Sequence, residues 1–211
     1  MIFEKLRSNR LNQWIIIHLR YLVGFAFFPS GLIKMTGERF TRISVDDPIG
    51  YFFEALYQSG FYWNFLGTAQ VLAGLLLVTQ RFATLGALFF LAILTNIWII
   101  TLSLSFGGTS VITSLMMIAV LILVIWDRHK LLPLVSYNKA VPVKAYPDPD
   151  RIWIMAGMVY AFCFTAMFLL GPTNTNAYTY WTAVFLGITI MLTFIISNHK
   201  AYKNRKLLLN P

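Results

Sequence analysis

The amino-acid sequence predicts an all-α membrane protein, a polytopic bundle of spanning helices with one short amphipathic helix on its outer side. Of the 211 residues 58% are hydrophobic and only 12% are charged, with a mean hydropathy of +0.67, so too few polar residues exist to coat a soluble protein of this size. Six apolar stretches come close to the roughly 20 residues that a spanning helix needs. Basic residues gather between alternate stretches, which is typical of cytoplasmic loops.

The apolar stretches form two blocks. A segment rich in proline and charge at residues 131–150 separates a four-span block, residues 1–130, from a two-span extension with a basic tail, residues 151–211. The first stretch is long, contains Arg20 and lacks a small-residue cleavage pattern, so we expect it to be retained rather than removed as a signal peptide. The expected spans are residues 14–36, 61–79, 82–105, 109–126, 152–171 and 178–197.

The first expected span carries a cation near each end. At 100° per residue, Arg20 and Lys34 lie within roughly 40° of each other around the helix axis. Gly24, Phe27 and Gly31 fall in the same sector, and we call these five residues the cationic stripe. Charges in lipid are costly and glycines let another backbone approach, so the stripe should face protein or a polar cavity. The alternative is that both cations reach outward and anchor the helix to lipid headgroups.

The sizeable segment between the first two spans has its own helix signal. Asp47 before Pro48 is a good helix start. Glycine at position 60 can end the helix, and about 11 residues are too few to span a membrane, so this helix should lie at the interface. Its polar face carries Glu54, which either contacts solvent or turns toward Lys34 or Arg39 and closes a polar chamber. Apolar residues follow at helical spacing: Ile49, Phe52, Phe53, Leu56 and Tyr57.

Polar and small residues also occur inside the second and third spans. In the second span Gly67, Gln70 and Gly74 lie within about 60° of one another, so this face can pack on the cationic stripe. Gln70 then either contacts a ligand or makes an ordinary interhelical hydrogen bond. The predicted ligand-binding set is Arg20, Gly24, Phe27, Gly31, Lys34, Glu54, Gln70, Gly74 and Asn96.

The sequence contains no self-contained catalytic or metal-binding constellation. His18, His129 and His199 are scattered, Cys163 is the single cysteine, and phosphate-loop, nucleophile-elbow and zinc-protease motifs are absent. The formal charge of +9 reflects orientation, because thirteen of the 17 cations flank the spans on the side of both termini. We therefore expect both termini in the cytoplasm and no nucleic-acid partner.

Two motifs resemble those of the DoxX-like family of bacterial membrane proteins. The first span is similar to the family signature of Arg, Gly, Gly and Lys in the run RYLVGFAFFPSGLIK, residues 20–34, and the second span contains QVLAGLLLVTQR, residues 70–81. The resemblance covers about residues 15–130 and implies a four-helix bundle in the bacterial inner membrane, here extended by two helices. Gln70 stands where many relatives have an acid. The positions supported by the resemblance are Arg20, Gly24, Gly31, Lys34, Gln70, Gly74 and Arg81.

The resemblance also implies a functional setting, because family members are associated with quinone-linked sulfur oxidation and with membrane redox or detoxification complexes. Our leading hypothesis is an accessory inner-membrane subunit that binds a quinone or a lipid headgroup at Arg20 and Lys34. No cofactor is encoded, so any oxidoreductase activity would need a partner subunit.

Two other functions stay open. A structural or assembly subunit could pack through the two-span extension, where Gly157 and Ala161 form a small-residue pattern. A small-molecule transporter is disfavoured, because every acid falls at a helix end or in a loop.

Overall fold

The computed structural model describes residues 6–135, 151–170, 187–193 and 195–196. The chain divides into two compact units, Met1–Tyr146 and Pro147–Pro211. All regular secondary structure in the described residues is helical, which confirms the predicted all-α class. Among the described residues, four helical segments are long and apolar enough to cross a membrane, so the protein is a membrane protein. These segments are Arg10–Met35, Phe61–Val78, Ala83–Ser103 and Gly107–Trp126.

The four segments coincide with the first four expected spans. The first is divided into two helices at Phe27, and Pro29 lies in the first turn of the second helix, where a proline is tolerated. A short helix follows this segment, as expected, and another follows the fourth span. The helices of this unit are α2 (Arg10–Ala26), α3 (Phe28–Met35), α4 (Pro48–Gln58), α5 (Phe61–Val78), α6 (Ala83–Ser103), α7 (Gly107–Trp126) and α8 (Arg128–Val135).

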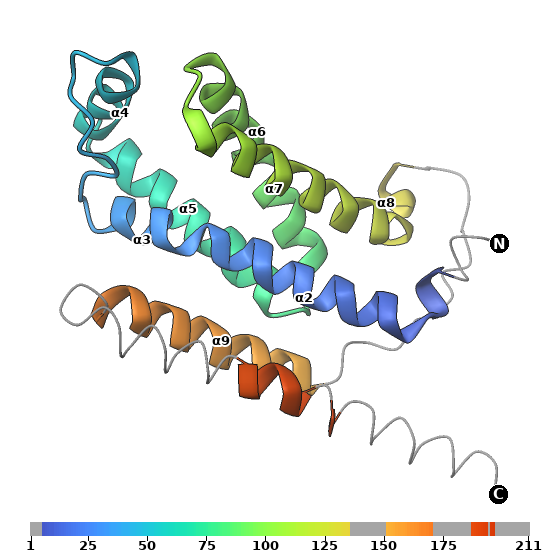
Figure 1. The fold of residues 1–211 in the computed structure, drawn as a ribbon. Coiled ribbons are helices and arrows are strands. Elements are labelled where there is room, and N and C mark those ends of the chain that lie inside the picture. Colours follow the sequence, from blue (N-terminus) through green and yellow to red (C-terminus); the bar gives the residue numbers. More distant parts are fainter. Residues whose placement is uncertain (1–5, 136–150, 171–186, 194, 197–211) are drawn as a thin grey trace, which may run out of the picture. The chain divides into compact units, whose positions relative to one another are not determined.

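The helices of the first unit form a ring of neighbours. Helix α5 contacts α2, α3 and α6, while α7 contacts α6 and returns to α2. Helix α4 lies at one end of this bundle, close to the turn between α6 and α7, and α8 lies at the opposite end (Figure 1). We call these the α4 end and the α8 end. Since α3 leads into α4 and α5 leads away from it, α3 and α5 run antiparallel.

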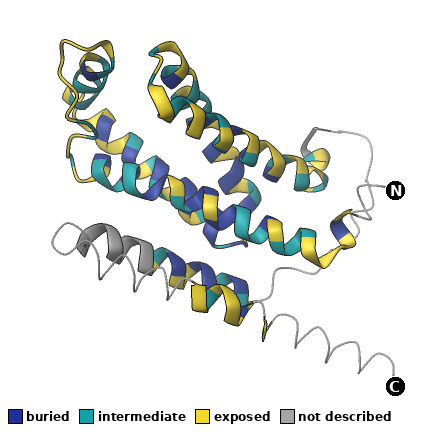
Figure 2. Cartoon of the chain, viewed as in Figure 1, coloured by how far each residue is buried: buried dark blue, intermediate teal, exposed yellow. Residues whose placement is uncertain are grey.

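The core lies between α2, α5, α6 and α7. Leu77, Phe90, Leu94, Val120 and Leu123 are completely buried there. Figure 2 shows buried residues on the inward faces of the helices and exposed residues on their outward faces. Many of the exposed residues are large and apolar, as a lipid-facing surface requires.

Two glycine pairs bring the first and second spans into backbone contact. A Cβ added at Gly24 would lie 3.0 Å from the carbonyl oxygen of Gly74, and one added at Gly31 would lie 3.1 Å from that of Gly67. The second span therefore packs on the cationic stripe, as its glycine spacing predicts. Only residues without a side chain permit so close an approach.

The second unit contains helix α9 (Arg151–Leu170), which coincides with the fifth expected span. Trp153, Ala156 and Tyr160 are buried on it. The sixth expected span, the linker at residues 136–150 and the basic tail lie largely or wholly outside the described residues. The division into a four-span block and a two-span extension therefore stays a prediction.

We predict that Gly67→Ala lowers the stability of the bundle. The new methyl group would overlap the backbone of Met35 and the carbonyl oxygen of Gly31, an overpacking that costs about 1–3 kcal/mol. Thermal unfolding in detergent, followed by tryptophan fluorescence, measures the effect. Gly108→Ala is the control, because a Cβ there meets nothing within 4 Å. Equal unfolding midpoints for the two variants would contradict the close packing.

Candidate functional site

The structure places the whole cationic stripe in the protein interior. Arg20 is 7% exposed and Lys34 is 5% exposed, and Gly24, Phe27 and Gly31 are buried between them. The two cations nevertheless lie in different surroundings, because Arg20 is toward the α8 end and Lys34 is at the α4 end.

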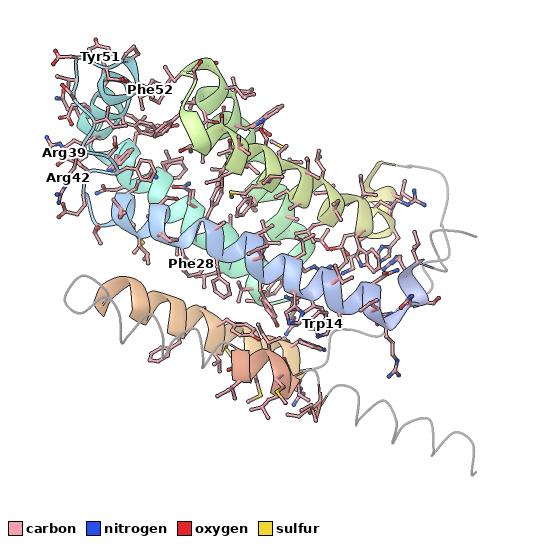
Figure 3. All side chains as sticks on the ribbon, in the orientation of Figure 1. Trp14, Phe28, Arg39, Arg42, Tyr51 and Phe52 are labelled. Carbon is pink, nitrogen blue, oxygen red and sulfur yellow. The ribbon has the colours of Figure 1, made fainter. Side chains whose placement is uncertain are left out.

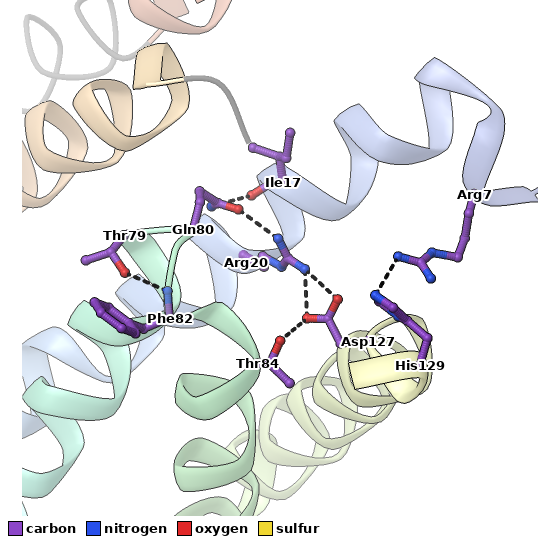
Figure 4. Close-up of polar contacts among 9 residues, drawn as sticks. All are labelled: Arg7, Ile17, Arg20, Thr79, Gln80, Phe82, Thr84, Asp127 and His129. Carbon is purple, nitrogen blue, oxygen red and sulfur yellow. Dashed lines mark hydrogen bonds and ion pairs between the residues drawn. The ribbon is translucent and has the colours of Figure 1, made fainter. Parts of the chain in front are cut away.

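Arg20 forms a buried ion pair with Asp127, the residue that directly follows α7 (Figure 4). Its Nη2 atom donates to both carboxylate oxygens of Asp127, at 2.8 and 3.1 Å. The hydroxyl of Thr84 donates to the same carboxylate at 2.9 Å, and the side-chain oxygen of Gln80 accepts from Nη1 of Arg20 at 3.1 Å. The charge of Arg20 is thus neutralised inside the protein.

The local conformation of Gln80 brings it into this network. It lies in the turn between α5 and α6 with φ of +58°, a left-handed backbone that few side chains adopt. Its amide also reaches the carbonyl oxygen of Ile17 on α2 at 3.5 Å. Gln80 and Asp127 are 1% and 2% exposed, so the network is sealed from solvent. It joins α2, the α5–α6 turn, α6 and the end of α7.

Sequence reasoning missed the partners of Arg20. Asp127 was counted among the acids at helix ends, and it does lie at one, yet it is almost fully buried. The available signal was its position directly after an apolar span, at the end of the bundle that also holds Arg20. No local pattern indicated Gln80 or Thr84.

The segment before α2 contacts the α8 end beside this network. The guanidinium of Arg7 donates to Nε2 of His129 at 3.2 Å and lies 5.8 Å from the ring centroid of Trp126. Burial, followed by the charge of Arg7, lowers the pKa of His129. A neutral imidazole at His129 is the form that can accept this hydrogen bond.

Lys34, by contrast, has no carboxylate partner among the described residues. Its Nζ atom donates to the carbonyl oxygen of Ser30 at 3.0 Å. Two aromatic rings flank the ammonium, with centroids 4.3 Å away at Phe40 and 5.2 Å away at Trp63. Trp63 is itself held, because its indole N–H donates to the carbonyl oxygen of Glu38 at 2.9 Å.

Gln70 lies near Lys34 on the facing helix. It is 1% exposed, and its side-chain oxygen has no hydrogen-bond partner within the described part of the chain. Gly31 packs on the Cβ of Gln70, and Gly67 packs on the Cβ of Lys34. Side chains lean toward the N-terminus of their own helix, so on antiparallel helices Lys34 and Gln70 lean toward each other. We call Lys34, Gln70, Phe40 and Trp63 the lysine site.

Helix α4 adjoins the lysine site through aromatic contacts. Asp47 caps the helix by accepting from the backbone N–H of Ile49 at 2.7 Å, as expected from the Asp-Pro start. The ring of Phe53 lies 5.3 Å from that of Phe40 and 5.9 Å from that of Phe106 in the α6–α7 turn. Phe53 thus connects α4 both to Phe40 of the lysine site and to the α6–α7 turn.

An exposed ion pair fastens α4 to the loop that precedes it. Both guanidinium nitrogens of Arg39 that face Glu54 donate to its carboxylate, at 2.9 and 3.0 Å. We call this pair the clasp. Glu54 is therefore turned toward Arg39 in an exposed contact, and the polar chamber stays a prediction. The hydrogen bond from Arg39 holds the pKa of Glu54 below its usual range. Arg39 lies with Arg42 and Tyr51 at the periphery of the α4 end (Figure 3).

The predicted ligand-binding residues thus divide into groups. Lys34 lies at the α4 end and Gln70 on the facing helix α5, with Glu54 in the clasp, whereas Arg20 belongs to the ion pair with Asp127. Phe27 stacks on Phe90 in the core, with ring centroids 3.6 Å apart, and the glycines serve the helix crossing. Asn96 is exposed on α6 and donates to the carbonyl oxygen of Ala92 in its own helix, so it is not brought to either cation.

We predict that removing either partner of the buried ion pair destabilises the protein by about 3–5 kcal/mol, because the other charge is left uncompensated in the interior. Arg20→Leu and Asp127→Leu should each lower the thermal unfolding midpoint in detergent, and the double variant should recover most of the loss. Arg42→Gln, at an exposed cation, is the control. Losses that simply add in the double variant would show that the pair does not act as a unit.

We predict that Glu54→Gln loosens α4 without changing the global unfolding midpoint. Because the folded-state pKa of Glu54 is lowered, the clasp persists at neutral pH and is lost only as the pH falls through that lowered value. Hydrogen–deuterium exchange of the α4 amides should be faster in Glu54→Gln, and in the unaltered protein at high salt. Arg42→Gln again serves as the control. An exchange rate of the α4 amides that changes neither in Glu54→Gln nor with ionic strength would show that the clasp does not hold α4.

Comparison with known proteins places the chain in a family. The DoxX family model matches residues 15–103. Uncharacterized protein YwoB of Bacillus subtilis (strain 168) is 31% identical over 117 residues, which cover 53% of this chain and 75% of the relative. No solved structure matches the chain. The matched residues contain most of α2 and all of α3, α4, α5 and α6, with both Arg20 and the lysine site. The chain belongs to the DoxX family.

Proposed function

We propose that this protein binds the oxygen-bearing polar head of a lipid-soluble molecule, a quinone or a lipid headgroup, at the lysine site. The observation that supports this proposal is the uncompensated charge of Lys34. The two cations of the stripe share one helix face, but only Arg20 has a carboxylate partner among the described residues.

The hydrogen-bonding capacity of Lys34 also favours an added ligand. An ammonium has three N–H donors, and a single acceptor, the carbonyl oxygen of Ser30, is in place. The faces of Phe40 and Trp63 compensate part of the charge, at about 0.5–2 kcal/mol for such contacts. The buried side-chain oxygen of Gln70 is a second polar atom that lacks a partner among the described residues. A ligand oxygen would accept from the ammonium of Lys34, and a hydroxyl group of the ligand would donate to Gln70.

The surroundings suit a ligand that is mostly apolar. Aromatic side chains flank Lys34, and the outward faces of the spans expose large apolar residues, as suits a ligand that partitions into the bilayer. The distribution of basic residues supports an orientation with both termini in the cytoplasm of a bacterium and the α4 end at the opposite face of the inner membrane.

The proposal makes the protein an accessory subunit. Family resemblance suggests a membrane redox complex, in which a partner subunit would carry the electrons and this chain would hold the lipid-soluble molecule. The alternatives of an assembly subunit or a transporter stay predictions. The assembly alternative depends on the two-span extension, of which the structure describes only part.

We predict that the purified full chain retains a lipid-soluble molecule and that Lys34→Met lowers its occupancy by about tenfold, the effect of losing roughly 1.4 kcal/mol of binding free energy. Organic extraction followed by mass spectrometry measures the retained molecule per protein. Arg42→Gln, which removes an exposed cation at the same end, should retain it fully. An empty unaltered protein, or equal occupancy in Lys34→Met, would overturn the proposed function.

A further inference from the structure

We propose that the head bound at the lysine site is an anionic phosphate group and not the neutral carbonyl of a quinone. This inference rests on the proposed function and narrows it to one class of ligand. It depends on the charges around Lys34 and on what each kind of oxygen could supply there.

The carboxylates at the α4 end are engaged elsewhere. Glu54 is held in the clasp and also accepts from Gln58 at 3.3 Å. Asp46 accepts from the hydroxyl of Ser44, and Asp47 caps α4. These groups are on the exposed side of the loop and of α4, where solvent screens them, whereas Lys34 is 5% exposed.

Glu38 is the remaining carboxylate of this segment, and it does not form an ion pair with Lys34. Its residue is exposed, and its contribution to the site is a backbone carbonyl oxygen that accepts from Trp63. No described acid therefore balances Lys34, although Arg20 on the same face has an acid dedicated to it. The charge of Lys34 is left for a group that comes from outside the chain.

A neutral oxygen and an oxyanion differ in the countercharge that each would bring to Lys34. A quinone carbonyl could accept a hydrogen bond from Nζ but would bring no countercharge to the ammonium in an apolar surrounding. A phosphate oxygen supplies a hydrogen bond and the countercharge together, and such charge-assisted bonds are roughly twice as strong as neutral ones. A single ammonium matches the single negative charge of a phosphodiester.

Gln70 fits the same ligand. An amide can donate through its N–H₂ group or accept through its oxygen, so it can contact a phosphate oxygen or a hydroxyl group of the same head. The atom of Gln70 that lacks a partner among the described residues is its side-chain oxygen, an acceptor, so a hydroxyl group of the head that donates to it would remove an existing penalty. The rings of Phe40 and Trp63 would then flank the head and exclude water.

The ligand must enter past Phe40 and α4, because Lys34 is nearly closed off in the structure. Helix α4 is fastened there by the ring contacts of Phe53 and by the exposed clasp. Displacing these contacts is cheaper than opening the glycine crossing beneath them, where backbones touch. The lipid-exposed side of the α4 end is thus the expected entrance.

The test compares ligands on the delipidated full chain in detergent, by native mass spectrometry. The probes are phosphatidylglycerol, diacylglycerol, decylubiquinone and inorganic phosphate. We expect phosphatidylglycerol to bind at least about tenfold more tightly than decylubiquinone or diacylglycerol, which lack a phosphodiester. Lys34→Met should abolish this preference, Lys34→Arg should keep it, and Arg42→Gln should leave it unchanged. Inorganic phosphate that competes with phosphatidylglycerol would support recognition of the phosphate alone, and phosphate that does not compete would support recognition of the lipid.

Each contrary result has a distinct meaning. Decylubiquinone that binds as tightly as phosphatidylglycerol, with both dependent on Lys34, would overturn the anionic head and leave the proposed function in place. If no lipid-soluble probe binds, or if binding does not depend on Lys34, both the anionic head and the proposed function would be overturned. The comparison of probes on the unaltered protein needs no variant, so it decides the question even if Lys34→Met does not fold.

Discussion

A positive charge in an apolar interior must be compensated, and the compensation of Arg20 determines how the bundle closes. Asp127 lies 107 residues further along the chain and comes from the end of the last span of this unit. Thr84 and Gln80 complete the network from two further elements. The ion pair therefore acts as a crosslink between the first and fourth spans at the α8 end. Without an acid there, burying Arg20 would be far more costly than leaving it at a lipid headgroup.

The close crossing of the first span and α5 at their glycines turns both cations into the protein. Contact between the backbones at Gly24 and Gly74, and again at Gly31 and Gly67, presses the first span against α5. The cations on the same face are thereby turned away from lipid. At the α8 end this places Arg20 beside Gln80 and Asp127, and at the α4 end it places Lys34 between aromatic rings. The same helix crossing thus buries one cation beside a carboxylate and the other between aromatic rings.

The difference between these ends is the main functional information in the structure. At the α8 end the charge of Arg20 is paired with that of Asp127, although the Nε atom of Arg20 has no hydrogen-bond partner among the described residues. The α4 end keeps a cation and a buried amide without full partners, next to a short helix that is fastened by an exposed ion pair. The residues that the DoxX family model matches include both cations and α4 but not Asp127.

The sequence by itself determined the membrane class, the first four spans, the start of α4 and the shared face of Arg20 and Lys34. These features follow from local rules, because lipid forces an apolar stretch to satisfy its backbone as a helix, and helical periodicity places residues on faces. The tertiary structure alone decided that Arg20 pairs with Asp127, that Glu54 turns to Arg39, and that Asn96 lies on the outside. Such outcomes depend on the depth and rotation of helices relative to one another, which no local spacing records. Asp127 illustrates the reason, since an acid at a helix end is exposed or buried according to what packs over it.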